Sequence, residues 1–384
     1  MRHFNHLSDE KKSLIFEHLP QSFSKATERE TLAYAVGATL YMPATQNFFE
    51  KLKDTTYKSL TSFVMCFEDA IAEADVSKGE ENVRNTLRQI IKGFETGTIE
   101  PDRMPLFFLR ARSPEQLQGF LQTLSSEEVS VLTGFTLPKF NSENALHFLT
   151  PIIETSNKFN TPLYGMPILE SRSIIYREQR EQELLALADI LSQSRENILN
   201  VRVGGTDFSS LFALRRDIDT SIYDIRVVSE CLTDIVNVFL REENRFVISA
   251  PVWEYFSNQR ILRPRLRITP FADKKQLSKR EALMDKAIDG LIREVVMDKA
   301  NGFVGKTIIH PSHIPYVNAF HAVTKEEYED AVMILNSASG GVAKSTSGNK
   351  MNEMNPHMSW AKKMMRKAQI YGVLKENDAY VDLF

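Results

Sequence analysis

The chain has 384 residues, of which 42% are hydrophobic and 25% are charged, as in an ordinary globular protein. Its 47 basic and 50 acidic residues give a formal charge of −3, and this charge argues against a general nucleic-acid binder. No stretch approaches the roughly 18 consecutive apolar residues of a membrane span, and the start, MRHFNHLSDEKK, lacks the apolar segment of a signal peptide. Two cysteines, Cys66 and Cys231, are too few for a disulfide framework or a cysteine-rich zinc site, so we expect a reduced, cytoplasmic protein.

In chain order, residues 1–33 are polar and charged and predict a helical N-terminal extension. Residues 34–337 then alternate short apolar runs with amphipathic stretches, which is typical of buried parallel strands separated by helices. Eight such runs predict strands: Ala38–Met42, Ser62–Phe67, Pro105–Leu109, Val131–Leu137, Pro162–Leu169, Ile198–Val203, Arg245–Ala250 and Gly305–Ile309.

Helix-start signals lie between these runs. Ser113 precedes a proline at the first helical position, and the pairs Ser125 with Glu128 and Thr324 with Glu327 have the spacing of a capping box. Glu178–Gln193 carries leucine and isoleucine residues at helical period.

Two segments are longer than a connection between a strand and a helix needs to be. Residues 254–285 form a predicted insertion after the seventh strand, and their basic cluster is either a solvated surface or an anion site: Arg260, Arg263, Arg265, Arg267, Lys274, Lys275, Lys279 and Arg280. Residues 338–384 form a predicted closing segment, with a flexible loop over 338–356 and a last helix over Met358–Tyr371.

Eight strands that alternate with helices predict an α/β fold, a (β/α)8 TIM barrel. An open doubly wound sheet would give the same alternation, usually with fewer strands and often with a glycine-rich first turn. Neither a G-x-G-x-x-G pattern nor a Walker A pattern follows any of these strands.

Barrel enzymes place their catalytic groups at the C-terminal ends of strands, where this chain has Glu68, Asp69, Arg110, Lys139 and several others. Among those others, Glu170 and Asp207 end neighbouring strands and could share one Mg²⁺ or Mn²⁺, with water and substrate as the remaining ligands. The alternative is that both acids are helix caps or salt-bridge partners.

The basic strand-end residues have two interpretations each. Arg110 could clamp a substrate carboxylate or form a structural ion pair with Glu68 or Asp69. Lys139 could in principle form a Schiff base, but we rank it as an electrostatic or structural residue. His310, followed by Ser312, could be a general base, although a structural hydrogen-bonding role is favoured.

The ordered motifs resemble the citrate lyase β-subunit-like branch of the HpcH/HpaI aldolase superfamily. The most specific stretch, GFVGKTIIHPSHI over 302–314, is similar to that family's G-F-x-G-K-x-x-I-H-P-x-Q-I signature, with His313 in place of glutamine. Shorter matches are Phe67–Ala70, Leu137–Lys139, Ile168–Glu170 and Gly205–Phe208. The resemblance covers roughly residues 38–365 and is strong because the set is ordered.

The resemblance implies a Mg²⁺-dependent barrel enzyme that makes or breaks a carbon–carbon bond next to a carbonyl of an oxo- or hydroxy-carboxylate. It assigns the metal to Glu170 and Asp207 and the substrate carboxylate to Arg110. Lys139, Gly205 and Thr206 would also contact substrate, and Glu68 and Asp69 would support Arg110 or waters on the metal. A homo-oligomer, often a trimer or hexamer, is also implied.

Two departures bear on that implication. The turn at 43–47 has no arginine where relatives help to hold coenzyme A phosphates, so a CoA-linked substrate is not favoured. Met351-Asn352-Glu353 is similar to an M-V-D pattern whose acid reaches a neighbouring subunit's site, which makes Glu353 a candidate acid/base residue. Two alternative functions remain. The protein could hydrolyse an acyl thioester at the same site, or it could be a catalytically inactive barrel that serves as a binding subunit.

Overall fold

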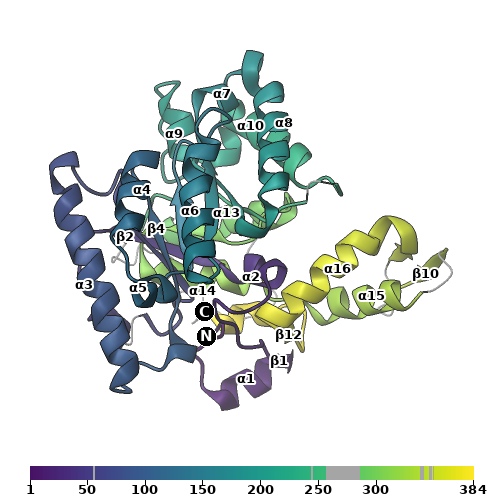
Figure 1. Ribbon diagram of the computed structural model, residues 1–384. Helices are drawn as coiled ribbons and strands as arrows, with labels where there is room; N and C mark the ends of the chain where they lie inside the picture. Colours follow the sequence, from purple (N-terminus) through teal and green to yellow (C-terminus); the bar gives the residue numbers. More distant parts are fainter. Residues whose placement is uncertain (55–56, 244, 257–285, 338–340, 346–347, 349) are drawn as a thin grey trace.

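The structure is a computed structural model that describes residues 1–54, 57–243, 245–256, 286–337, 341–345, 348 and 350–384 (Figure 1). Eight parallel strands form its central sheet in the order β8-β7-β6-β5-β4-β3-β2-β9. Their bounds are β2 Ala38–Pro43, β3 Ser62–Cys66, β4 Leu106–Arg110, β5 Gly134–Leu137, β6 Tyr164–Leu169, β7 Val201–Val203, β8 Ile248–Ser249 and β9 Lys306–Ile308. All eight predicted strands are therefore confirmed.

The two edge strands of this sheet meet and close it into a barrel. Ala250 and Lys306 form a parallel bridge, and the amide of Val304 donates to the carbonyl of Ile248 at 2.8 Å. The predicted TIM barrel is confirmed, because an open doubly wound sheet would leave these edges apart.

Helices surround the barrel, and three predicted caps are confirmed at Ser113, Ser125 and Thr324. The helices of the β/α connections are α3 Val76–Glu95, α4 Pro114–Gln122, α5 Ser126–Val131, α6 Ala145–Phe159, α7 Arg172–Ile175, α8 Arg177–Gln193, α9 Gly205–Ser210, α10 Arg226–Phe239, α13 Lys286–Ala300 and α14 Ile314–Ala319. The described part of the β2–β3 connection contains one short 3-10 turn, Lys51–Lys53.

Alternation along the strands decides which side chains face the interior. On β4, Phe107 and Leu109 pack in the cluster between strands and helices, whereas Phe108 packs with Val64 and Met166 in a second cluster. Because successive strand residues point to opposite faces, Arg110 lies on the same side as Phe108 and projects into the barrel at its C-terminal end.

The N-terminal extension and the chain's end close the other end of the barrel together. Phe4, Phe23, Ile370 and Leu383 belong to the same buried cluster as Phe108. The extension contains α1 Asp9–Ile15 and α2 Arg29–Ala35 as predicted, and also a short strand, β1 Phe16–His18, which pairs antiparallel with β12 Val373–Leu374. Residues more than 350 positions apart thus pair, which no local pattern indicates.

The segment after the barrel forms an arm that projects to one side (Figure 1). It consists of α15 Lys325–Asn336 and α16 Met354–Tyr371, which pack through Ile334 and Met364, and of the hairpin β10 Val342–Lys344 with β11 Met351–Glu353. The predicted loop over 338–356 is therefore wrong for its described residues, because Gly341 and Gly348, both at positive φ, allow a short antiparallel hairpin there.

The predicted basic insertion lies almost wholly outside the described residues, since 257–285 contain all eight of its arginines and lysines. Among the described residues, no helix is long and apolar enough to cross a membrane.

Candidate active site

Strand ends bring the predicted polar residues together at the C-terminal mouth of the barrel. Glu68 and Asp69 follow β3, and Arg110 ends β4. Lys139 and Glu170 follow β5 and β6, and Asp207 lies in the first turn of α9, directly after β7. Six residues that are spread over 140 positions of the chain thus form one cluster because their strands are parallel neighbours.

Arg110 is the centre of this cluster. Its Nη2 lies 2.8 Å from Glu68 Oε2 and 3.1 Å from Glu170 Oε1, and its Nη1 lies 3.1 Å from Asp69 Oδ2. Burial opposes the charge of Arg110, but Glu170 and the other carboxylates raise its pKa. The guanidinium is therefore a fixed positive charge at the mouth of the barrel.

Lys139 contacts three of the carboxylates from a backbone conformation that is unusual for lysine. With a φ of +49°, its amide donates to Glu170 Oε1 at 2.9 Å. Its ammonium pairs with Glu68 and lies 3.9 Å from Asp69 Oδ1. The left-handed backbone is what turns the amide toward Glu170 while the side chain reaches Glu68.

Glu170 and Asp207 are adjacent acids with raised pKa values. Burial raises the pKa of Glu170 to about 8, with Asp207 adding to the effect and Arg110 opposing it. Burial, together with the charge of Asp69, also raises the pKa of Asp207. Burial is thus the main cause of both shifts, and the neighbouring acids add to it.

The charge balance of the cluster suits a divalent cation. Four carboxylates (Glu68, Asp69, Glu170 and Asp207) face two cations (Arg110 and Lys139), a formal charge of −2. Among the described residues, no three His, Cys, Asp or Glu side chains are arranged to hold a metal ion by themselves. Glu170 and Asp207 offer carboxylate oxygens, the kind of ligand that Mg²⁺ and Mn²⁺ prefer, and water or substrate would have to supply the other ligands.

Pockets for small ligands usually measure about 300–1,000 Å³, and the pocket beside this cluster measures about 530 Å³. Gly204, Gly205 and Thr206 form one wall, where Thr206 Oγ1 donates to Glu254 Oε1 at 2.8 Å. The predicted substrate residues Gly205 and Thr206 therefore line the same pocket as Arg110, Glu170 and Asp207.

Arg202 on β7 also lines this pocket and was not predicted from the sequence. It is almost fully buried, its Nη2 donates to Thr307 Oγ1 at 2.7 Å, and its guanidinium carbon lies 5.6 Å from the centre of the Tyr41 ring. Within the described residues it has no ion pair with a carboxylate. An arginine inside the apolar run Ile198–Val203 was the signal that could have indicated it.

Other predicted residues lie elsewhere. His310 Nδ1 is 2.7 Å from Ser312 Oγ and accepts from the Ser312 amide, so it caps the turn that follows β9. Glu353 is exposed at the end of β11 in the arm and does not line the pocket.

Residues 30–373 match the family described as C–C bond lyases of the TIM-barrel fold. The fold is similar to that of CitE from Mycobacterium tuberculosis in complex with magnesium, acetoacetate and coenzyme A, with a TM-score of 0.51 and 18% identity over 88% of this chain and 99% of that chain. It is also similar to a citrate lyase from Burkholderia xenovorans LB400, with a TM-score of 0.60 and 16% identity over 91% and 96%. The curated proteins contain no match.

Proposed function

Because the chain belongs to the C–C bond lyases of the TIM-barrel fold, we propose that it makes or breaks a carbon–carbon bond next to the carbonyl of a small oxo- or hydroxy-carboxylate. The observation that carries this proposal is that four carboxylates, Glu170 and Asp207 among them, meet two cations beside a pocket that also contains Arg202. These groups suit a metal ion and a carboxylate side by side.

Glu170 and Asp207 would hold Mg²⁺ or Mn²⁺, which supplies a Lewis acid for the negative charge that develops on a substrate oxygen. Arg110 adds positive charge beside it and is held in place by three carboxylates. Glu68 and Asp69 act as positioning residues, because both pair with Arg110 and Lys139 and so hold these two cations in place.

Arg110 and Arg202 both line the pocket and would bind the substrate carboxylate. Arg202 has only hydroxyl partners, from Thr39 and Thr307, so a carboxylate can approach it without displacing another anion. An arginine that is buried without a counter-ion gains most from an incoming carboxylate, since the cost of its burial has already been incurred in the free protein.

Glu353 has a proposed role only in an oligomer. Its exposed position on the arm would allow it to reach the pocket of a second copy as an acid/base residue. A trimer or hexamer would supply that copy, and mixed oligomers of Glu353→Gln with Arg110→Lys would then recover activity that neither variant has alone.

The solved relative from Mycobacterium tuberculosis was obtained with coenzyme A. In this chain the turn after β2, residues 43–47, has no arginine for CoA phosphates, and its glutamine, Gln46, instead accepts from Lys51 at 2.5 Å. We therefore propose that the substrate is a free carboxylate and not a CoA thioester. Product analysis separates lyase from thioester hydrolase, because hydrolysis leaves the carbon skeleton joined.

The test uses isothermal titration of Mg²⁺ and Mn²⁺ into the full chain, followed by turnover of pyruvate, oxaloacetate and glyoxylate monitored by NMR. Glu170→Gln with Asp207→Asn should abolish metal binding and turnover. Glu154→Gln, at an exposed position of α6, should change neither. Metal affinity of the double variant equal to that of the unaltered protein would contradict the proposal.

A further inference from the structure

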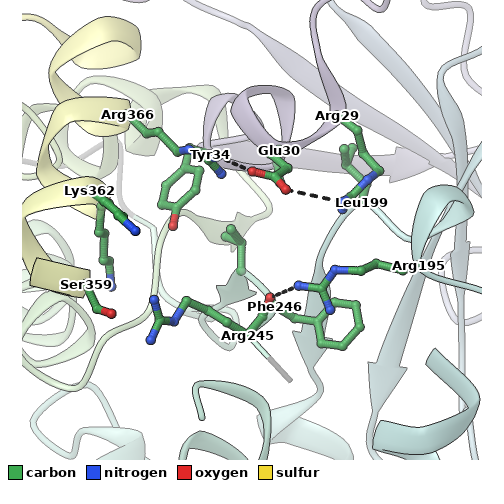
Figure 2. A pocket seen from close by; sticks show the side chains of 13 residues that line it. Arg29, Glu30, Tyr34, Arg195, Leu199, Arg245, Phe246, Ser359, Lys362 and Arg366 are labelled. Carbon is green, nitrogen blue, oxygen red and sulfur yellow. Dashed lines mark hydrogen bonds and ion pairs between the residues drawn. The ribbon is translucent and has the colours of Figure 1, made fainter. Parts of the chain in front are cut away.

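A second cavity, of about 210 Å³, lies at the opposite end of the barrel (Figure 2). Its walls come from α2, from the residues that precede β7 and β8, and from α16 of the arm. Because all barrel strands are parallel, residues that precede strands lie at the N-terminal end, whereas the active-site cluster follows the strands. The cavity is therefore separate from the proposed catalytic pocket.

Positive charge dominates this cavity. Six cationic side chains line it, and one carboxylate, Glu30, lines it with them: the cations are Arg29, Arg195, Arg245, Lys362, Lys363 and Arg366. Glu30 pairs with Arg366 and lies 3.9 Å from Arg29, whose Nε is 3.7 Å from Glu196. Even with both acids counted, four positive charges remain.

Two of these cations have no protein partner for their charged groups. The guanidinium of Arg245 and the ammonium of Lys362 make no hydrogen bond or ion pair with any described residue. Figure 2 shows the Arg245 guanidinium pointing toward the side of the cavity formed by Lys362 and Ser359. Cations that converge without an acid between them are favourable when an anion binds there.

Lys363 supports the same conclusion from the back of the cavity. Its ammonium donates to the carbonyl of Gly302 at 2.9 Å. Burial, together with the charges of Arg245 and Lys299, lowers its pKa to about 8. An anion bound beside Arg245 would offset that repulsion.

An apolar recess of about 200 Å³ adjoins the cationic cavity and shares Tyr34, Arg245 and Phe246 with it. Its own walls are Leu240, Val304 and Trp360 among others. A ligand that fills both spaces needs a highly charged part and a flat apolar part, because aromatic side chains pack best against planar groups.

We propose that this pair of cavities binds a nucleoside di- or triphosphate, with the phosphate chain between Arg245 and Lys362 and the base against Trp360. Arginine and lysine side chains provide charged hydrogen bonds to phosphate oxygens. The ligand would also connect the barrel to the arm, since Arg245 precedes β8 whereas Lys362 and Trp360 belong to α16. This inference is independent of the proposed lyase activity.

The test measures the affinity of the full chain for ADP by titration calorimetry and thermal shift, in buffer without divalent cations. ADP should raise the melting temperature, and Arg245→Gln with Lys362→Gln should weaken ADP binding about tenfold or more. Lys92→Gln, an exposed lysine of α3, is the matched control and should leave the affinity unchanged. Glu170→Gln should also leave it unchanged, which separates this site from the catalytic pocket.

Pyrophosphate serves as the second probe. Trp360→Leu should weaken ADP binding but not pyrophosphate binding, because only ADP reaches the apolar recess. No binding of ADP or ATP at about 1 mM, or equal affinities in the Arg245/Lys362 double variant and the Lys92→Gln control, would overturn the proposal. Equal affinities for ADP and pyrophosphate would overturn the assignment of the recess and identify free diphosphate as the ligand.

Discussion

Gly204 lies directly against the carboxyl-bearing side chain of Glu170. A Cβ on Gly204 would fall 2.6 Å from Cβ of Glu170 and closer still to its Oε2. The backbone between β7 and α9 thus approaches Glu170 so closely that only glycine leaves room for the carboxylate beside Asp207. The position of the proposed metal ligand depends on a residue that has no side chain.

Gly204→Ala should therefore displace Glu170 and weaken Mg²⁺ binding about tenfold or more, at a cost of about 1–3 kcal/mol in the free energy of unfolding. Gly119→Ala is the control, because a Cβ there meets nothing within 4 Å on α4. It should stabilise the protein by about 0.5–1 kcal/mol and leave metal binding unchanged. Titration calorimetry and urea unfolding measure both effects, and unchanged metal affinity in Gly204→Ala would refute the expectation.

Arg202→Met should have opposite effects on stability and on substrate binding. Removing a buried charge that has only hydroxyl partners should raise the free energy of unfolding by about 1 kcal/mol. The same change should weaken binding of pyruvate or oxaloacetate about tenfold, because the carboxylate loses a charged partner. Arg241→Met, at an exposed position just after α10, serves as control. A variant that is stabilised and still binds carboxylates normally would remove Arg202 from the substrate site.

Lys139→Gly and Lys139→Ala separate the side chain of this residue from its backbone. Both variants lose the contact with Glu68, but only alanine retains a Cβ at a φ of +49°. Lys139→Gly should therefore be more stable than Lys139→Ala by about 1 kcal/mol in urea unfolding. Equal stabilities would show that the left-handed backbone relaxes when the side chain is removed.

The pH dependence of stability should report Asp298 on α13. Its Oδ2 lies 2.9 Å from Lys306 Nζ, and its Oδ1 accepts from the Tyr223 hydroxyl at 2.8 Å. Burial raises its pKa from 3.8 to about 6, with Glu294 adding to the effect and Lys306 opposing it. The folded protein thus binds this proton more tightly than the unfolded chain, so the stabilisation is complete below pH 3.8 and is lost as pH rises through 6.

Asp298→Asn removes this titration. The unfolding free energy of the unaltered protein, relative to that of Asp298→Asn, should fall by about 2 kcal/mol between pH 4 and pH 6. Asp189→Asn, at an exposed position of α8, should show a constant difference over the same range. A constant difference for Asp298→Asn as well would mean that this carboxyl group titrates at its ordinary pKa.

The amino-acid sequence by itself determined the barrel and most of its mouth. Apolar runs of strand length and capping residues such as Ser125 and Thr324 are local signals, because strand burial and helix capping depend on residues a few positions apart. Parallel strands must also bring their C-terminal ends to one rim, so Arg110, Glu170 and Asp207 could be placed together before their geometry was known.

Only the tertiary structure decided which charges are neutralised and how the ends of the chain meet. Arg110 has three carboxylate partners and Arg202 has none among the described residues, although both are arginines in apolar strands. The pairing of β1 with β12, and the cavity shared by α2 and α16, join residues more than 300 positions apart. Such contacts follow from how the closed barrel packs its two termini, and no short-range pattern of the sequence encodes them.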